Sequence, residues 1–147
     1  MPGTGIQKTV LVVEDEASVR RLLAKSLGAW GFRTIEAGNG REAIEHLARE
    51  TPAAIVIDLL MPIMSGVELL KALRRNSFFR TIPTVVMTGV VEPRQIAALG
   101  VPVVLKPDLA KLPELLAQLI ARKNSDSVTE LDVATNPAVS EEVASGG

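Results

Sequence analysis

Five short runs of mostly apolar, β-branched residues alternate along this chain with segments in which apolar residues recur at helical spacing. The runs predicted to be strands cover residues 9–13, 33–37, 54–58, 84–87 and 101–105. The third and fourth runs are almost continuously apolar, which is typical of strands covered on both faces in a parallel sheet. The alternation therefore predicts an α/β protein with a doubly wound, five-stranded parallel sheet and helices on both faces.

The intervening segments predict helices with one apolar face each. They cover about residues 17–30, 40–50, 65–76, 92–99 and 112–123. The apolar stripe of the first helix comprises Val19, Leu22, Leu23, Leu27 and Trp30. We therefore expect Trp30 to be a core residue. The fourth helix is shortened, because Pro93 stands near its start and Gly100 ends it after about two turns.

Size and composition narrow the class of protein. A chain of 147 residues suits one domain. The absence of cysteine excludes a disulfide framework and thiolate metal sites, and a single histidine, His46, excludes a metal site built from several histidines. No segment reaches the roughly 18 apolar residues of a membrane span, and the N-terminus has no signal-peptide pattern. We therefore expect a cytoplasmic protein.

Charge divides the chain into two parts. Sixteen basic and twelve acidic residues lie at or before Lys123, whereas the last 24 residues carry five acids and no base. The positive balance of the first part is too small and scattered to indicate direct DNA binding. We expect a flexible N-terminus at 1–7, a folded domain at 8–123, and a mostly disordered acidic tail at 124–147 that is too short for an output domain.

Polar side chains stand where four of the five predicted strands end. Glu14 and Asp15 follow the first strand, Asp58 ends the third, Thr88 follows the fourth and Lys106 follows the fifth. The carboxyl ends of parallel strands meet at one edge of a sheet, where α/β proteins bind ligands. Acids gathered there either repel one another or hold a hard cation such as Mg²⁺.

These side-chain types suit phosphoryl transfer. A carboxylate such as Asp58 can attack phosphorus to give an acyl phosphate, and a divalent metal neutralises the anionic oxygens of the donor. Lys106 would supply a point charge for the remaining phosphoryl oxygens, and the Thr88 hydroxyl is placed to sense them. The structural alternative is an Asp58–Lys106 ion pair with Thr88 as an ordinary strand-end residue.

Four motifs occur in a recognisable order. They are LVVEDE at 11–16, DLLMPIMSG at 58–66, VVMTG at 85–89 and LKP at 105–107. Together, over about residues 8–122, they resemble the response-regulator receiver domain of two-component phosphorelay signalling. The resemblance implies a flavodoxin-like sheet with strand order 2-1-3-4-5 and a signalling module rather than an enzyme.

The resemblance also implies a Mg²⁺ site. Asp15 would bind the ion directly and Glu14 through a water molecule. Asp58 and the backbone carbonyl of Leu60 would complete the protein ligands.

Further roles implied by the resemblance concern the phosphoryl group. Asp58 would be the phosphoacceptor, Thr88 would hydrogen-bond the phosphoryl group, and Lys106 would pair with it. Pro107 would follow a cis peptide bond, as in the family. The donor would be a sensor histidine kinase or a histidine phosphotransfer protein, and phosphorylation would switch contact with a downstream protein target. The oligomeric state stays open.

Three alternatives to a stand-alone, phosphorylation-controlled receiver were considered. The chain could be a shuttle that passes phosphate between Asp58 and a partner histidine, or a scaffold that has lost phosphotransfer. An aspartate-nucleophile phosphatase would carry a general acid two residues after the nucleophile. Leu60 occupies that position, which argues against a phosphatase.

The chain departs from the family pattern in three places. Val103 stands where the family usually has Tyr or Phe, so the usual threonine–aromatic switch is in doubt. The stretch from Thr88 to Lys106 is about one helical turn shorter than is typical, so we do not expect the common dimer surface. Aliphatic Leu60 and Val90 flank the path of the hydrolytic water, and we expect them to prolong the acyl phosphate.

Overall fold

One parallel sheet forms the centre of the protein. The computed structural model describes residues 7–89, 98 and 100–135. Its strands are β1 (Thr9–Val13), β2 (Arg33–Ala37), β3 (Ala54–Asp58), β4 (Thr84–Thr88) and β5 (Val103–Leu105). They pair in the order β2-β1-β3-β4-β5, and every pairing is parallel. The predicted α/β class, the doubly wound sheet and the strand order are confirmed.

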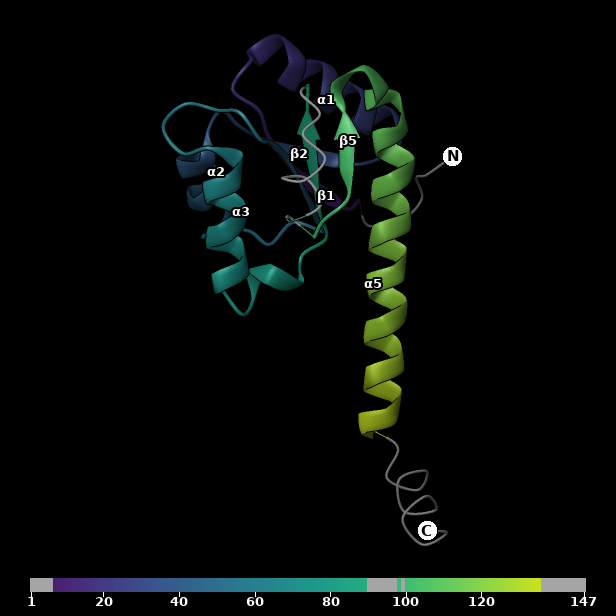
Figure 1. Cartoon of the computed structure of the whole chain (residues 1–147). Coiled ribbons are helices and arrows are strands. Elements are labelled where there is room, and N and C mark those ends of the chain that lie inside the picture. The colour runs from purple at the N-terminus through teal and green to yellow at the C-terminus, as the bar shows by residue number, and fades with distance from the viewer. Residues whose placement is uncertain (1–6, 90–97, 99, 136–147) are drawn as a thin grey trace, which may run out of the picture.

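Helices cover both faces of this sheet. They are α1 (Ala17–Ala29), α2 (Gly40–Leu47), α3 (Gly66–Arg75) and α5 (Leu112–Thr135), with 3-10 turns η1 (Phe79–Thr81) and η2 (Lys106–Lys111). Core contacts place α1 and α5 on one face and α2 and α3 on the other, as Figure 1 shows. The helix predicted at 92–99 lies outside the described residues except for Ala98, which is helical.

Side chains of the central strands alternate between the two layers. Val10 and Val12 of β1 pack in the cluster with α1 and α5, whereas Leu11 and Val13 pack in the cluster with α2 and α3. All five residues of β3 are buried. This two-sided burial explains the nearly continuous apolar runs, because neither face of a central strand meets water.

The prediction that Trp30 is a core residue was wrong. Helix α1 ends one residue earlier, and Gly31 adopts a left-handed φ of 91°. The amide of Phe32 donates to the carbonyl of Leu27, and the amide of Gly31 donates to that of Gly28, which together form a Schellman motif. The motif turns Phe32 into the core, whereas Trp30 stays 43% exposed. Leu22, which is also outside the core, is 62% exposed.

The last helix is longer than predicted. It was expected to end at Lys123, but α5 continues to Thr135 and extends past the body of the domain (Figure 1). Extending a helix that already exists fixes one residue per new hydrogen bond, which is far less costly than starting one. The predicted end of the helix at Lys123 is therefore wrong, whereas the disorder expected for 124–147 stays a prediction. Residues 136–147, and 1–6 of the expected flexible N-terminus, lie outside the described residues.

The remaining differences are local. Helix α2 ends at Leu47 rather than near residue 50, and β5 begins two residues later than predicted. The cis bond expected before Pro107 stays a prediction. Pro107 lies in the first turn of η2, a position that suits the fixed φ of proline.

Candidate functional site

Register brings the ends of the central strands to one edge of the sheet. Val13 of β1 pairs with Ile57 of β3, and Asp58 at the end of β3 pairs with Met87 of β4. Glu14 and Asp15 therefore lie beside Asp58, at the ends of the neighbouring strands β1 and β3. From β1 the chain continues to β2 at one edge of the sheet, and from β3 it continues towards β5 at the other edge. Ligands of doubly wound sheets bind at this switch point.

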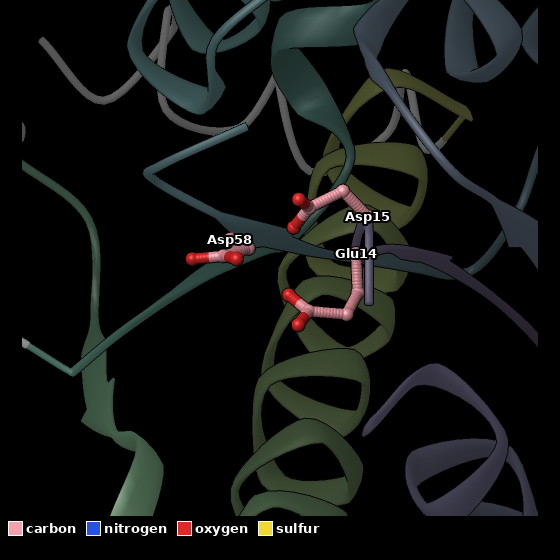
Figure 2. Close-up of side chains that lie close together, drawn as sticks. All are labelled: Glu14, Asp15 and Asp58. Carbon is pink, nitrogen blue, oxygen red and sulfur yellow. The ribbon is translucent and has the colours of Figure 1, made fainter. Parts of the chain in front are cut away.

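Three acids meet at this edge. Glu14, Asp15 and Asp58 each offer a carboxylate oxygen, and these oxygens lie within 4.8 Å of one another. Figure 2 shows the carboxylates of Glu14 and Asp15 on the side that faces Asp58. Glu14 is fully buried and Asp58 is 3% exposed, whereas Asp15 is exposed to solvent. The structure therefore assembles the three predicted acids into one cluster with an open side at Asp15.

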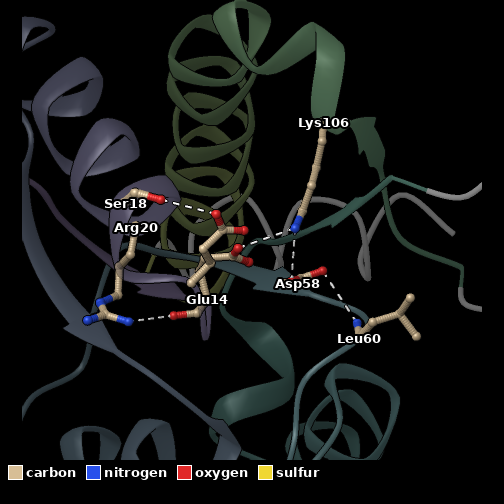
Figure 3. A network of polar contacts seen from close by, with 7 residues as sticks. Glu14, Ser18, Arg20, Asp58, Leu60 and Lys106 are labelled. Carbon is tan, nitrogen blue, oxygen red and sulfur yellow. Dashed lines mark hydrogen bonds and ion pairs between the residues drawn. The ribbon is translucent and has the colours of Figure 1, made fainter.

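Lys106 bridges the two buried acids. Its Nζ donates to Oε1 of Glu14 and to Oδ2 of Asp58, each at 3.2 Å (Figure 3). Burial lowers the pKa of Lys106, but hydrogen bonds and attraction from Asp58 and Glu14 outweigh burial and raise the pKa above 10.5. Lys106 is therefore a permanent cation that faces Asp58, as the sequence suggested.

The buried position of Glu14 disfavours its ionised form. Burial, followed by the hydrogen bond and repulsion from Asp58, raises the pKa of Glu14 to about 8 despite the opposing effect of Lys106. Its Oε2 is buried and has no hydrogen-bond partner among the described residues. A buried carboxylate oxygen without a donor is costly, and a divalent cation is the partner that three clustered carboxylates suit best. The donor set therefore fits the Mg²⁺ expected from the sequence.

The loop after Asp58 is held close to the end of β3. The amide of Leu60 donates to Oδ1 of Asp58 at 3.3 Å, and the amide of Gly66 donates to the carbonyl of Leu59 at 3.0 Å. A Cβ at Gly66 would lie 2.1 Å from the Asp58 carbonyl oxygen, so only glycine fits there. Ser65 then caps α3 by accepting from the amide of Glu68. These contacts fix the phosphoacceptor candidate between a strand and a helix.

Thr88 and Val103 lie on the neighbouring strands β4 and β5. Thr88 ends β4, is 2% exposed and lies opposite Leu105 in the β4–β5 ladder, one residue before Lys106. Val103 pairs with Val86 on the same ladder and is partly buried. The structure thus places Thr88 at the same edge as the acids, and no ring stands on β5. Val90 lies outside the described residues.

Arg20 is a site neighbour that the sequence did not reveal. Its Nη1 donates to the backbone carbonyl of Glu14 at 2.8 Å (Figure 3). Its Nε contacts Oε1 of Glu36 at 3.2 Å. The sequence placed Arg20 only off the apolar stripe of its helix. A hydrogen bond to a backbone carbonyl cannot be recognised from a sequence motif, because a residue of any type carries such an acceptor.

Comparison with known proteins decides the family. The family model described as "Response regulator receiver domain" matches residues 10–117. The chain belongs to the response regulator receiver family. Receiver domains are signalling modules of two-component systems, so the recognition made from the four motifs is confirmed.

Individual relatives of this receiver agree with that result. A signal receiver domain of a signal transduction histidine kinase from Syntrophus aciditrophicus is 30% identical, covers 78% of this chain and 90% of its own, and superposes with a TM-score of 0.72. The Vibrio cholerae chemotaxis protein CheY4 is 28% identical, with coverages of 78% and 99% and a TM-score of 0.71. The "Probable transcriptional regulator ycf27" of Porphyra purpurea is 36% identical over 86 residues, which are 58% of this chain and 34% of that protein.

The match to the curated relatives is partial. The chain spans about a third of the length of the transcriptional regulators it matches. Within the part of the chain that the structure describes, no helix combines the length and apolar character needed to cross a membrane.

Proposed function

We propose that this receiver accepts a phosphoryl group on Asp58 in a Mg²⁺-dependent reaction and thereby switches a protein–protein contact. The observation that carries the proposal is the cluster of Glu14, Asp15 and Asp58 with Lys106 bonded across it. A structural ion pair would need one acid. Three acids, one with an unpartnered buried oxygen, leave a negative excess that a divalent cation offsets.

The residues of the site divide the chemistry among them. A carboxylate oxygen of Asp58 attacks phosphorus, the new O–P bond forms as the P–N bond to the donor histidine breaks, and the leaving imidazole is protonated. Lys106 pairs with the developing charge on the phosphoryl oxygens. The Thr88 hydroxyl, on the adjacent strand end, hydrogen-bonds the phosphoryl group of the product.

The metal would be held by the three carboxylates. Asp15 and Asp58, which belong to the acidic cluster, would bind Mg²⁺ directly. Glu14 would act through a water molecule, and the Leu60 carbonyl would be a further oxygen ligand. When bound, Mg²⁺ supplies positive charge that neutralises the phosphoryl oxygens. The fit rests on the oxygen-only donor set and on the orphaned Oε2 of Glu14.

The donor and the output follow from the family. A histidine kinase or histidine phosphotransfer protein supplies the phosphoryl group, and a downstream protein reads the change. Direct DNA contact is not part of the proposal, because the charge of residues 8–123 is small and scattered. We also propose that the protein is cytoplasmic, as expected from the sequence. Because β5 carries Val103, the signal leaves Asp58 without the usual aromatic side chain.

A mass measurement tests the proposal. Wild-type protein is incubated with MgCl₂ and acetyl phosphate or phosphoramidate, and a base-labile gain of about 80 Da, one HPO₃ unit, is expected. Asp58→Asn should show no gain, whereas Asp108→Asn, which removes an aspartate outside the cluster, should be labelled like wild type. An unlabelled wild type, or equal labelling of Asp58→Asn, would refute phosphorylation at Asp58.

A further inference from the structure

The two peptide groups on either side of Glu14 are each held by a hydrogen bond. The amide of Glu14 donates to the carbonyl of Ala37 at 3.0 Å, as a continuation of the β1–β2 ladder. The carbonyl of Glu14 accepts from Nη1 of Arg20 at 2.8 Å. That carbonyl belongs to the peptide plane that ends at the Cα of Asp15, so its orientation helps to fix the point from which the Asp15 side chain extends.

Asp15 depends on that backbone for its direction. Among the described residues, no side chain or amide hydrogen-bonds the Asp15 carboxylate, and the residue is exposed. Asp58, in contrast, is fixed by Lys106 and by the amide of Leu60. The acid expected to bind the metal most directly is therefore the one whose own side chain is least constrained.

We propose that Arg20 is a positioning residue for the metal site, which fixes the Glu14–Asp15 peptide and is itself held by Glu36 at the end of β2. This inference rests on the proposed Mg²⁺-dependent function of the acidic cluster. Residues that orient metal ligands typically change metal affinity by about 10–100-fold when they are removed.

The arginine fork explains why one side chain can do this. Nε contacts Oε1 of Glu36 while Nη1 reaches the Glu14 carbonyl, so two donors of one rigid plane serve two strands. A lysine keeps the charge but has no planar fork, and it cannot reproduce both contacts in fixed geometry. The Arg20–Glu36 pair is partly exposed, with side chains that are 20% and 40% accessible. Such a pair contributes little to stability, so its main effect would be on the geometry of the site.

The chain offers a matched control for this contact. Arg33 lies on β2, the strand that also carries Glu36. It pairs with Glu50 and donates to the hydroxyl of Thr9, but its contacts do not include the acidic cluster. Arg33→Ala removes a partly exposed arginine–glutamate pair of the same kind from the opposite end of the strand. Any loss that comes only from breaking such a pair should appear equally in Arg33→Ala and Arg20→Ala.

Binding of MgCl₂ to each full-length variant, measured by isothermal titration calorimetry, tests the inference. We expect Arg20→Ala to raise the Mg²⁺ dissociation constant by about tenfold or more. Arg20→Lys should give a smaller rise, and Arg33→Ala should stay within about twofold of wild type. Arg20→Lys also serves as the deciding variant if Arg20→Ala does not fold. Wild-type affinity in the folded Arg20 variants, or an equal loss in Arg33→Ala, would overturn the positioning role.

Two further readouts separate positioning from stability. With phosphoramidate as donor, Arg20→Ala should need more Mg²⁺ for half-maximal labelling but reach nearly the wild-type rate at saturating Mg²⁺. In metal-free protein, the amides of Asp15 and Glu16 should exchange with deuterium faster in Arg20→Ala than in Arg33→Ala. If wild type binds no Mg²⁺, the proposed function fails; if wild type binds it and the Arg20 variants bind it equally well, only the role of Arg20 fails.

Discussion

The Nζ of Lys106 lies 3.2 Å from Oδ2 of Asp58, although 48 positions separate the two residues along the chain. The same nitrogen bonds Glu14, so this single cation offsets two buried carboxylates. Both acids lie at the end of a central strand, where burial strengthens the repulsion between them. The Lys106–Asp58 contact therefore links the stability of the sheet edge to the chemistry of the site.

Replacing this cation should destabilise the metal-free protein. Lys106→Met leaves Glu14 and Asp58 without their shared partner, and we expect the free energy of unfolding to fall by about 1–3 kcal/mol. Urea denaturation in EDTA measures the change. Lys111→Met, which alters an exposed lysine at the end of η2, should change stability by less than about 0.5 kcal/mol. Equal losses in the two variants would mean that the ion pairs of Lys106 add nothing.

Stability of the metal-free protein should depend on pH through Glu14. Its pKa is raised from 4.5 to about 8, so the folded protein keeps a proton that the unfolded chain has already lost. The contribution of Glu14 to the free energy of unfolding is therefore largest below pH 4.5. It decreases as pH rises from 4.5 to about 8. Urea titrations between pH 5 and 9 in EDTA check this slope, which Glu14→Gln should abolish and the exposed Glu16→Gln should retain.

Binding of Mg²⁺ should show the opposite pH dependence. The ion favours ionised carboxylates, so its affinity should rise as pH increases towards about 8, and binding near neutral pH should release a proton from Glu14. Calorimetry in two buffers of different ionisation enthalpy measures the released proton. Proton release that is unchanged in Glu14→Gln would assign it to another group.

The loop after Asp58 should not tolerate a side chain at Gly66. A Cβ there would lie 2.1 Å from the Asp58 carbonyl oxygen, so Gly66→Ala must displace either α3 or the strand end. We expect a loss of about 2–4 kcal/mol in unfolding free energy and much slower labelling of Asp58. Gly28→Ala is the matched control, because Gly28 is exposed in the last turn of α1 and its Cβ would meet no atom within 4 Å. It should stabilise the protein by about 0.5–1 kcal/mol.

Ile63 offers a stabilising substitution in the same loop. It has a φ of 70°, a left-handed conformation that is unfavourable for a β-branched residue, and its side chain is 71% exposed. Ile63→Asn should raise the free energy of unfolding by about 1 kcal/mol, because asparagine tolerates this φ and no buried contact is lost. A chemical denaturation curve decides the sign, and a less stable variant would show that Ile63 makes a favourable contact.

Leu60 should influence the lifetime of the acyl phosphate. Its side chain is 67% exposed next to Asp58, where an aliphatic group cannot orient a water molecule for attack. Leu60→Asn places a hydrogen-bonding group there and should speed hydrolysis by about tenfold, equivalent to about 1.4 kcal/mol of barrier. The decay of the phosphorylated form, followed by mass spectrometry, gives the rate. An unchanged lifetime would remove Leu60 from the explanation.

Most of the sheet could be predicted because its signal is local. Burial on both faces makes β1 and β3 nearly continuous in apolar residues, and the acids that follow them mark their ends. The cluster at the strand ends was predictable for the same reason, since parallel strands in register bring their carboxyl ends together. What the sequence could not show was which hydrogen bonds each acid makes.

The failures have physical causes of the same kind. Trp30 fits the helical period of α1, but a Schellman motif reversed the chain after it and gave its place in the core to Phe32. Polar residues after Lys123 predicted that the last helix ends there, but propagation of an established helix carried α5 to Thr135. Arg20 was missed because its acceptor is a backbone carbonyl. In each case the structure depends on a hydrogen bond that involves at least one backbone group, and the pattern of side chains along the sequence does not reveal such a bond.

The position of Trp30 determines how this protein can be observed. The chain has one tryptophan and no tyrosine, so its ultraviolet emission comes from a single indole. Trp30 is the C-cap residue of α1, a helix of 13 residues and thus about 20 Å long, and it lies at the end opposite Asp15. It is already 43% exposed, so unfolding will shift its emission only modestly, and events at Asp58 will leave it unchanged. Fluorescence studies of phosphorylation in this receiver therefore require an introduced chromophore near the strand ends.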